Sequence, residues 1–328
     1  MRRFAVRFFA TLFSVAVLVI GAGIIWAWDG YRADGPLEKS VAIVIPKGAG
    51  VQDIAVRLLE VGAIENQHLF VLGSQYTETA RRMRAGEFAL KSGMSMREIA
   101  DHLVSGETVK RRLTVREGLL TEEVISLVAA TDGLVGDAPV LQPDGIYLPE
   151  TYFFSYGDTR QSVLTRMERA MTEAVTAAWA ERSKKIAISS PREAIILASI
   201  IERETGVDAE RAKVSSVFHN RLRRQMRLQS DPTVAYAVTG GGRPLGRPLT
   251  RADLYIDSDY NTYRRVGLPP GPIANPGRAA LMAAVQPIDT KFLYFVADGT
   301  GGHAFARTLR EHNRNVAKWR RIQRQRPQ

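Results

Sequence analysis

Two acidic residues, Glu202 and Glu204, stand directly after the uncharged run Ala194–Ile201. The run is apolar on every side, so it predicts a buried helix rather than an amphipathic one. A carboxyl group at the edge of a buried helix loses hydration, and this raises its pKa toward the range that suits a general acid. The alternative is a charged pair that only marks the return of the helix to solvent.

Cleavage of a glycosidic bond is a reaction that needs such an acid, and hydrolases usually employ two carboxyl groups for it. Glu202 and Glu204 are two positions apart, and side chains at that spacing do not face each other on a helix. Only one of them is therefore expected to face the site. Glu202 is the predicted catalytic residue because it falls on the stripe of Ala198 and Ser199, whereas Glu204 is expected to contact solvent or the neighbouring arginine.

The elements that must position this acid can be predicted from the same sequence. Ser190 is a typical N-cap, Pro191 suits the first helical position, and Glu193 is placed to complete a capping box, so a helix is predicted over 191–204. The remaining pattern predicts an α+β fold with helices over 161–182, 211–227, 281–285 and 308–323, and with a strand over 292–297 that forms a hairpin with 303–305.

The N-terminus carries the strongest hydrophobic signal. Residues 8–28 are uncharged and long enough to cross a bilayer, which takes about 20 residues. The arginines within residues 1–7 predict a cytoplasmic N-terminus, so the rest of the chain lies outside an inner (plasma) membrane. The alternative is a cleaved signal peptide, whose apolar core is usually shorter. Residues 29–40 are polar and turn-rich, and are predicted to be a linker.

A repeat follows over residues 41–112. Aligning Gly48 with Gly93 also aligns Asp53 with Glu98, and each copy predicts a strand, a glycine turn and a short amphipathic helix. A weaker third copy follows Gly118. Such units resemble LysM modules, which bind wall glycans, although strand–turn–helix is also a common packing unit.

The composition narrows the class of partner. The chain has 328 residues, a net charge of +11 and no cysteine, so thiolate metal sites and cysteine nucleophiles are excluded. Its five histidines lack the close spacing of a zinc site, and no metal or organic cofactor is expected. A basic chain exported behind a membrane anchor is expected to meet anionic lipid or wall polymer rather than nucleic acid.

Several ordered motifs downstream carry a family resemblance. They are Ala198–Thr205, Val217–Leu222, Met226–Tyr236, Tyr260–Tyr263, Gly267–Ile273 and Tyr294–Gly299. Together with the anchor and the LysM-like region they resemble the endolytic murein transglycosylase (YceG-like) family over nearly the whole chain. The resemblance implies that residues 113–328 form a lytic transglycosylase domain.

The resemblance also implies a reaction. The family cleaves nascent peptidoglycan between N-acetylmuramic acid and N-acetylglucosamine, leaves a 1,6-anhydro end and is thought to terminate strand elongation. The family's single catalytic glutamate falls on Glu202. One glutamate suffices for a lytic cut, because it can protonate the leaving oxygen and then accept the proton of the sugar's own C6 hydroxyl.

Further polar and aromatic residues are candidates for substrate binding, and for each of them a structural role is the alternative. Asp-Pro-Thr at Asp231 is also a helix-start signal, and Glu150 is a fallback acid with an expected structural role. The predicted substrate-binding residues are Asn220, Gln229, Asp231, Tyr260, Asn261 and Tyr263.

Two other functions remain open at this point. The chain could be a membrane-anchored, non-catalytic peptidoglycan-binding scaffold, or a hydrolytic muramidase that pairs Glu202 with a distant aspartate such as Asp231. In each case the expected partners are peptidoglycan strands and the membrane, with wall-synthesis enzymes as candidates.

Overall fold

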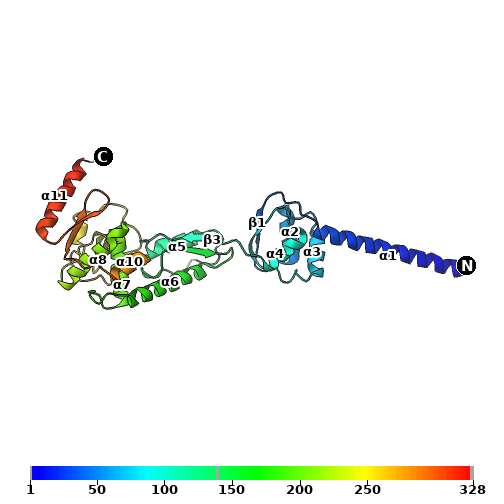
Figure 1. The fold of residues 1–328 in the computed structure, drawn as a ribbon, viewed down its shortest axis with the longest axis horizontal. Helices are drawn as coiled ribbons and strands as arrows, with labels where there is room; N and C mark the ends of the chain where they lie inside the picture. The colour runs from blue at the N-terminus through cyan, green and yellow to red at the C-terminus, as the bar shows by residue number, and fades with distance from the viewer. Residues whose placement is uncertain (1, 138–139, 326–328) are drawn as a thin grey trace. The chain divides into compact units, whose positions relative to one another are not determined.

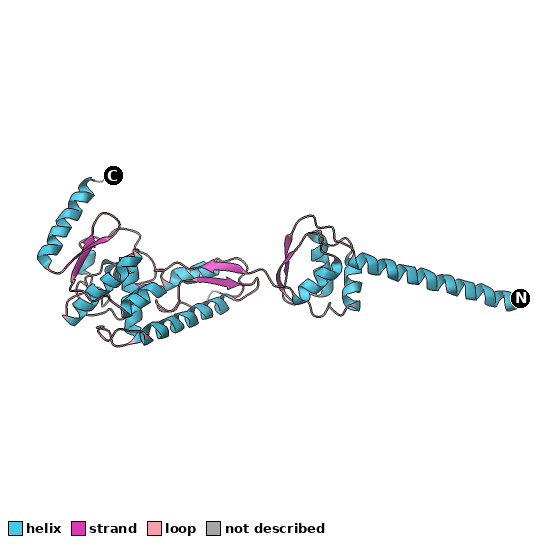
Figure 2. Cartoon of the chain, viewed as in Figure 1, coloured by secondary structure: helices cyan, strands magenta, loops and turns pink. Residues whose placement is uncertain are grey.

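The structure is a computed structural model that describes residues 2–137 and 140–325. It mixes helices with short two-stranded sheets (Figure 2), in agreement with the predicted α+β class. The chain divides into two compact units, residues 1–111 with 154–158 and residues 112–153 with 159–328. The elements of the first are α1 (Arg2–Arg32), β1 (Val41–Ile45), α2 (Val51–Glu60), α3 (Gln67–Tyr76), β2 (Gly86–Leu90) and α4 (Met96–Ser105).

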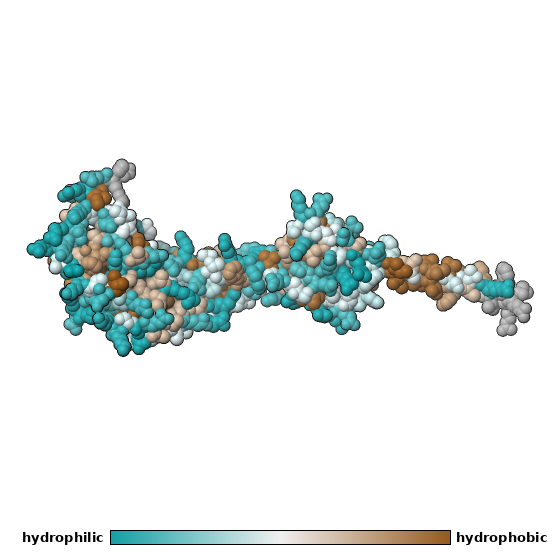
Figure 3. Space-filling view, in the orientation of Figure 1, coloured by the Kyte–Doolittle hydropathy of each residue, from teal (hydrophilic) through white to brown (hydrophobic). Residues whose placement is uncertain are grey.

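The apolar N-terminal run forms most of α1. Its stretch Arg7–Arg32 is long and apolar enough to cross a membrane, and it is the brown rod in Figure 3. The helix does not stop at Trp28 but continues to Arg32, where the sequence predicted a linker. The reason is tertiary packing: Tyr31 is 1% exposed and belongs to the core of the first unit.

The two copies of the repeat pair with each other. Strands β1 and β2 run antiparallel, with Val41 opposite Leu90 and Ile45 opposite Gly86. Helices α2 and α4 follow their strands as predicted, whereas α3 between the copies was not predicted. The buried positions of α3 include Gly73 and the small residue Ser74, so it lacks the apolar stripe by which a sequence reveals a helix.

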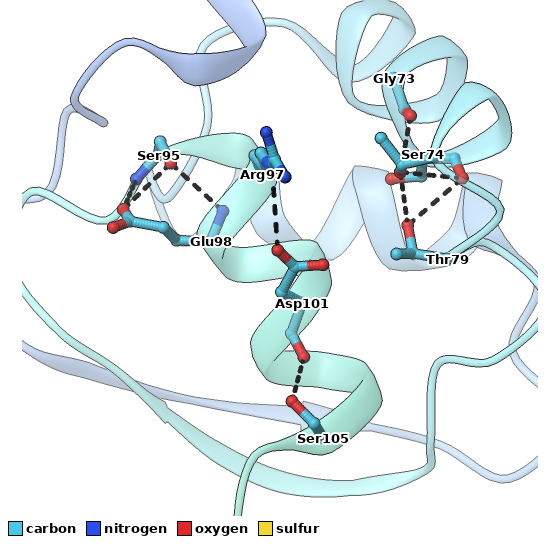
Figure 4. A network of polar contacts seen from close by, with 9 residues as sticks. Gly73, Ser74, Thr79, Ser95, Arg97, Glu98, Asp101 and Ser105 are labelled. Atoms are coloured by element: carbon cyan, nitrogen blue, oxygen red, sulfur yellow. Dashed lines mark hydrogen bonds and ion pairs between the residues drawn. The ribbon is translucent and has the colours of Figure 1, made fainter.

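The aligned acids of the repeat have a capping role. The Asp53 carboxylate accepts from the Gly50 N–H at 3.2 Å. Glu98 accepts from the Ser95 N–H at 2.9 Å while its own N–H donates to the Ser95 hydroxyl at 3.2 Å (Figure 4). Both acids therefore occupy the third position of a helix, where a carboxylate satisfies a free N–H group.

The second unit is built around α7 (Pro191–Glu204), as labelled in Figure 1. Helices α6, α8, α9 and α10 pack on α7, and most of α7's apolar residues belong to one core cluster. The predicted hairpin is present, with Tyr294 opposite Ala306. The elements are β3 (Arg111–Thr114), α5 (Thr121–Ala129), β4 (Thr151–Phe154), α6 (Arg160–Ala180), α7, α8 (Asp208–Arg223), α9 (Asp231–Thr239), the short η1 (Asp253–Tyr255), α10 (Arg278–Val285), β5 (Tyr294–Ala297), β6 (His303–Ala306) and α11 (Leu309–Gln325).

Candidate active site

The helix that carries the two acids begins as predicted, with one difference. The Ser190 hydroxyl accepts from the Glu193 N–H at 3.2 Å and Pro191 occupies the first turn. The Glu193 carboxylate, however, accepts from the N–H of Ser189 at 2.6 Å, one residue earlier than a capping box requires. Both contacts fix the start of this buried helix. Glu202 and Glu204 lie in its last turn, at the edge of the core.

Glu202 lies in an ion-pair cluster. One carboxylate oxygen is 3.2 Å from Nη2 of Arg211, and the other accepts from the Gly277 N–H at 2.8 Å. Only 4% of the Glu202 side chain is exposed. Arg211 is also buried, and it pairs with Asp208 and with Glu117, the latter at 3.5 Å. Both oxygens of Glu202 are thus occupied by donors of the protein itself.

Glu117 completes this cluster and was not singled out from the sequence. Burial raises its pKa, with the Glu202 charge adding to the effect and Arg211 opposing it. A Cβ at position 277 would lie 1.8 Å from a Glu117 oxygen, so a larger residue there would displace the Glu117 carboxylate. The cluster brings Glu117 and Gly277, which are 160 positions apart in the chain, to the pair of Glu202 and Arg211, and no local pattern signals such an arrangement.

Glu204 has a different environment. Its carboxylate accepts from the Ser230 hydroxyl at 2.5 Å, and the residue stays partly exposed. Burial raises the pKa of Glu204 to about 7, with the nearby Asp231 adding to the effect and the Ser230 hydrogen bond and Arg221 opposing it. Glu204 therefore has the raised pKa that suits a general acid, and its hydrogen-bond partner is Ser230 rather than Arg203.

The loop around Ser230 holds two of the predicted substrate-binding residues, Gln229 and Asp231, and a third, Tyr263, contacts Asp231 from another loop. Gln229 adopts a left-handed φ of 50°, and its N–H donates to the Thr262 carbonyl at 3.1 Å. Asp231 opens α9, as its helix-start pattern allowed, and accepts from the Tyr263 hydroxyl at 2.6 Å. Three of the predicted residues therefore lie in the region around Glu204, namely Gln229, Asp231 and Tyr263.

Arg221 holds this loop in place through hydrogen bonds from its guanidinium group. It is buried, and its guanidinium donates to the carbonyls of Leu293 and Leu228, both at 2.7 Å. It also lies 5.2 Å above the Tyr294 ring and 3.4 Å from the side-chain oxygen of Gln229. A fixed positive charge therefore acts on the Glu204 carboxyl group and favours its ionised form.

Two of the predicted residues use their amides within the protein. Asn261 is fully buried, and it donates to the carbonyls of Leu254 and Ile256 while accepting from the Tyr263 N–H at 3.0 Å. Asn220 donates to the carbonyls of Thr290 and Phe292, both at 2.9 Å. Both residues shape loops, which is the structural alternative given for them from the sequence.

Tyr260 belongs to a separate aromatic patch. Its ring lies 4.7 Å from that of Tyr236, and the Tyr236 hydroxyl donates to Asp144 at 2.8 Å. Burial raises the pKa of Asp144. Tyr236 and Asp144 line a cavity of about 360 Å³ beside Gly240–Gly242. The fallback acid Glu150 forms an ion pair with Arg278 at 2.5 Å, in keeping with a structural role.

Known proteins resemble this chain over most of its length. Residues 43–318 match the YceG-like family. An endolytic murein transglycosylase of Bacillus subtilis is 32% identical over 92% of this chain and 91% of its own length. One from Streptococcus pneumoniae is 27% identical over 95% of this chain and 65% of its own length. The crystal structure of a yceG-like protein from Listeria monocytogenes is 30% identical, with a TM-score of 0.52 over 84% of this chain and 99% of that one.

Proposed function

This chain belongs to the YceG-like family, and from that premise we propose that it is an endolytic peptidoglycan transglycosylase that cuts the bond between N-acetylmuramic acid and N-acetylglucosamine within glycan strands. The product of the cut is a 1,6-anhydro end, and the cut terminates the elongation of nascent strands. The resemblance to relatives named endolytic murein transglycosylases supports the activity. The single structural observation that supports the chemistry is the protonatable Glu204 beside Asp231 and Tyr263.

We assign the proton transfer to Glu204 rather than to Glu202. A general acid works best when its pKa lies near the working pH, and burial raises the pKa of Glu204 to about 7. Glu202 is held by Arg211 and by the Gly277 N–H, so each of its oxygens already has a hydrogen-bond donor within the protein. Glu202 remains the alternative proton donor and is tested beside Glu204 below.

The reaction balances with one carboxyl group. Protonated Glu204 donates its proton to the glycosidic oxygen as the bond from that oxygen to C1 of the muramic acid breaks. The Glu204 carboxylate then accepts the proton of the C6 hydroxyl, whose oxygen forms the new bond to C1, and no water is consumed. The nearby Arg221 stabilises the carboxylate between the two steps.

The experiment digests purified glycan strands with the full chain and identifies the new ends by mass spectrometry. Glu204→Gln is expected to lower the rate by roughly 10²-fold or more and to keep the fold. Glu202→Gln is the matched control: it leaves Arg211 buried beside a neutral partner, so its main expected effect is lower stability.

Other outcomes would assign the activity differently. Full activity in Glu204→Gln together with a folded, inactive Glu202→Gln would make Glu202 the proton donor. Reducing ends in place of anhydro ends would indicate a muramidase, with Asp231 as the second acid. A wild-type chain that binds strands without cutting them would be a scaffold.

We also propose where the reaction takes place. The apolar part of α1 fits a single-pass anchor in the inner membrane, and the arginines that precede it favour a cytoplasmic N-terminus. Both compact units then lie outside the cytoplasm, where peptidoglycan is found. Wall-synthesis enzymes that supply nascent strands are the proposed protein partners, and the LysM-like region is a proposed second contact with glycan.

A further inference from the structure

An apolar groove lies between α1 and α3 within the first unit. Its volume is about 600 Å³, and apolar and aromatic side chains of both helices dominate its walls. The side chains on its rim are strongly exposed, with Leu72 at 63% and Tyr76 at 78%. Large exposed apolar surfaces of this kind mark sites of contact with a partner or a membrane. The lining residues are Ile24, Ala27, Trp28, Tyr31, Leu69, Leu72, Gly73, Gln75 and Tyr76.

The groove is continuous with the candidate membrane span. Ile24 and Ala27 belong to the uncharged run 8–28, yet they line the same groove as Leu72 and Tyr76. Ile24 lies about 6 Å along the helix axis before Trp28, inside the run. Whatever medium surrounds Ile24 must therefore also reach the end of α3.

Close packing holds α3 against the C-terminal part of α1. A Cβ on Gly73 would lie 2.4 Å from the Tyr31 ring, so this ring lies directly against the α3 backbone at Gly73. The rings of Trp28 and Tyr76 meet edge to face at 5.4 Å. The C-terminal half of α3 is thus held against the part of α1 where the apolar run ends.

We propose that the C-terminal half of α3 lies in the outer surface layer of the bilayer, with Leu72 and Tyr76 inserted among the lipids and a lipid acyl chain in the groove. The residue types fit this position, because aromatic rings concentrate at the boundary between headgroups and hydrocarbon. An apolar helix face at that depth is typical of interfacial helices. The first unit is then attached to the membrane at two places, the membrane span and α3.

The experiment uses the absence of cysteine from the natural chain. The full-length variants Leu72→Cys and Tyr76→Cys are spin-labelled and reconstituted in nanodiscs of phosphatidylethanolamine and phosphatidylglycerol. Collisions with oxygen, which concentrates in lipid, are compared with collisions with a water-soluble nickel chelate. Val56→Cys on α2 is the matched control, because Val56 is an apolar residue of the same unit with 43% exposure.

The expected result is an oxygen-to-nickel collision ratio several-fold higher at positions 72 and 76 than at position 56. Equal, water-like ratios at all three positions would overturn the proposal. So would labels at 72 and 76 that are immobilised and shielded from both reagents, because that result indicates a protein partner or a second copy on this face.

Discussion

At the scale of the residue, Glu204 makes stability depend on pH in a predictable direction. Its pKa is 4.5 in an unfolded chain and about 7 in the fold, where burial disfavours the charged form. The folded state therefore holds the proton more tightly between these values, and stability falls as pH rises from about 4.5 and levels off above about 7. The full difference corresponds to roughly 3 kcal/mol in the free energy of unfolding.

Urea unfolding at pH 5 and pH 8 measures this contribution. Glu204→Gln lacks the ionisation, so its stability should exceed that of the wild type at pH 8 and approach it at pH 5. The comparison with wild type removes the contributions of Glu117 and Asp144, whose pKa values burial also raises. An identical pH profile for both proteins would mean that Glu204 ionises freely in the fold.

The buried Asn261 is expected to contribute to stability rather than to affinity. Asn261→Ala leaves two carbonyls and the Tyr263 N–H without their partner, which costs roughly 1–3 kcal/mol. Chemical denaturation should report this loss, while KM for glycan strands at low temperature should stay within error of the wild-type value. A raised KM with unchanged stability would instead indicate a direct contact with the sugar.

The sequence identified the carboxylate pair but not the different environments of its two members. The spacing of Glu202 and Glu204 excluded a dyad because it depends only on helix geometry. Their environments depend on Arg211, Gly277 and Ser230, which the fold brings in from α8, the loop before α10 and the loop before α9. Contacts of that kind have no local signature in the sequence.

At the scale of the element, the contact between α1 and α3 leaves no room for a side chain at Gly73. Gly73→Ala places a methyl group 2.4 Å from the Tyr31 ring, so one helix must shift, at a cost of roughly 1–3 kcal/mol. Gly21→Ala is the matched control, because nothing lies within 4 Å of its added Cβ. Thermal unfolding of the full chain in detergent should show a lower transition temperature for the first variant alone, and equal values would contradict the close packing.

Elements with a regular apolar period were predicted well, and elements defined by packing were not. Helices α2, α4, α6 and α7 and the β5–β6 hairpin follow the predicted pattern to within a few residues. Helix α8 begins at Asp208 and ends at Arg223, several residues before the predicted limits, since charges at both ends obscure its boundaries. The extension of α1 beyond Trp28 depends on the pocket that receives Tyr31.

At the scale of the whole molecule, the N-terminal helix is expected to remain attached as an anchor. The wild-type chain should resist extraction from membranes by alkaline carbonate, and deletion of residues 2–24 should release it to the soluble fraction. The deletion keeps the last two turns of α1, so Tyr31 retains its packing. Mass spectrometry of the membrane-bound protein should find an intact N-terminus, whereas a chain that begins after residue 20 would indicate a cleaved signal peptide.

In the membrane-anchored chain that we propose, the unbroken passage of α1 into the core of the first unit links that unit mechanically to the surrounding lipid. A helical span longer than the hydrocarbon layer leans in order to stay immersed, and the lean grows as the layer becomes thinner. Because Tyr31 locks the helix against α3, the module must rotate by the same angle as the span. We therefore expect bilayer thickness to set the tilt of the first unit relative to the membrane, and lipid composition to change that tilt without any change in the protein.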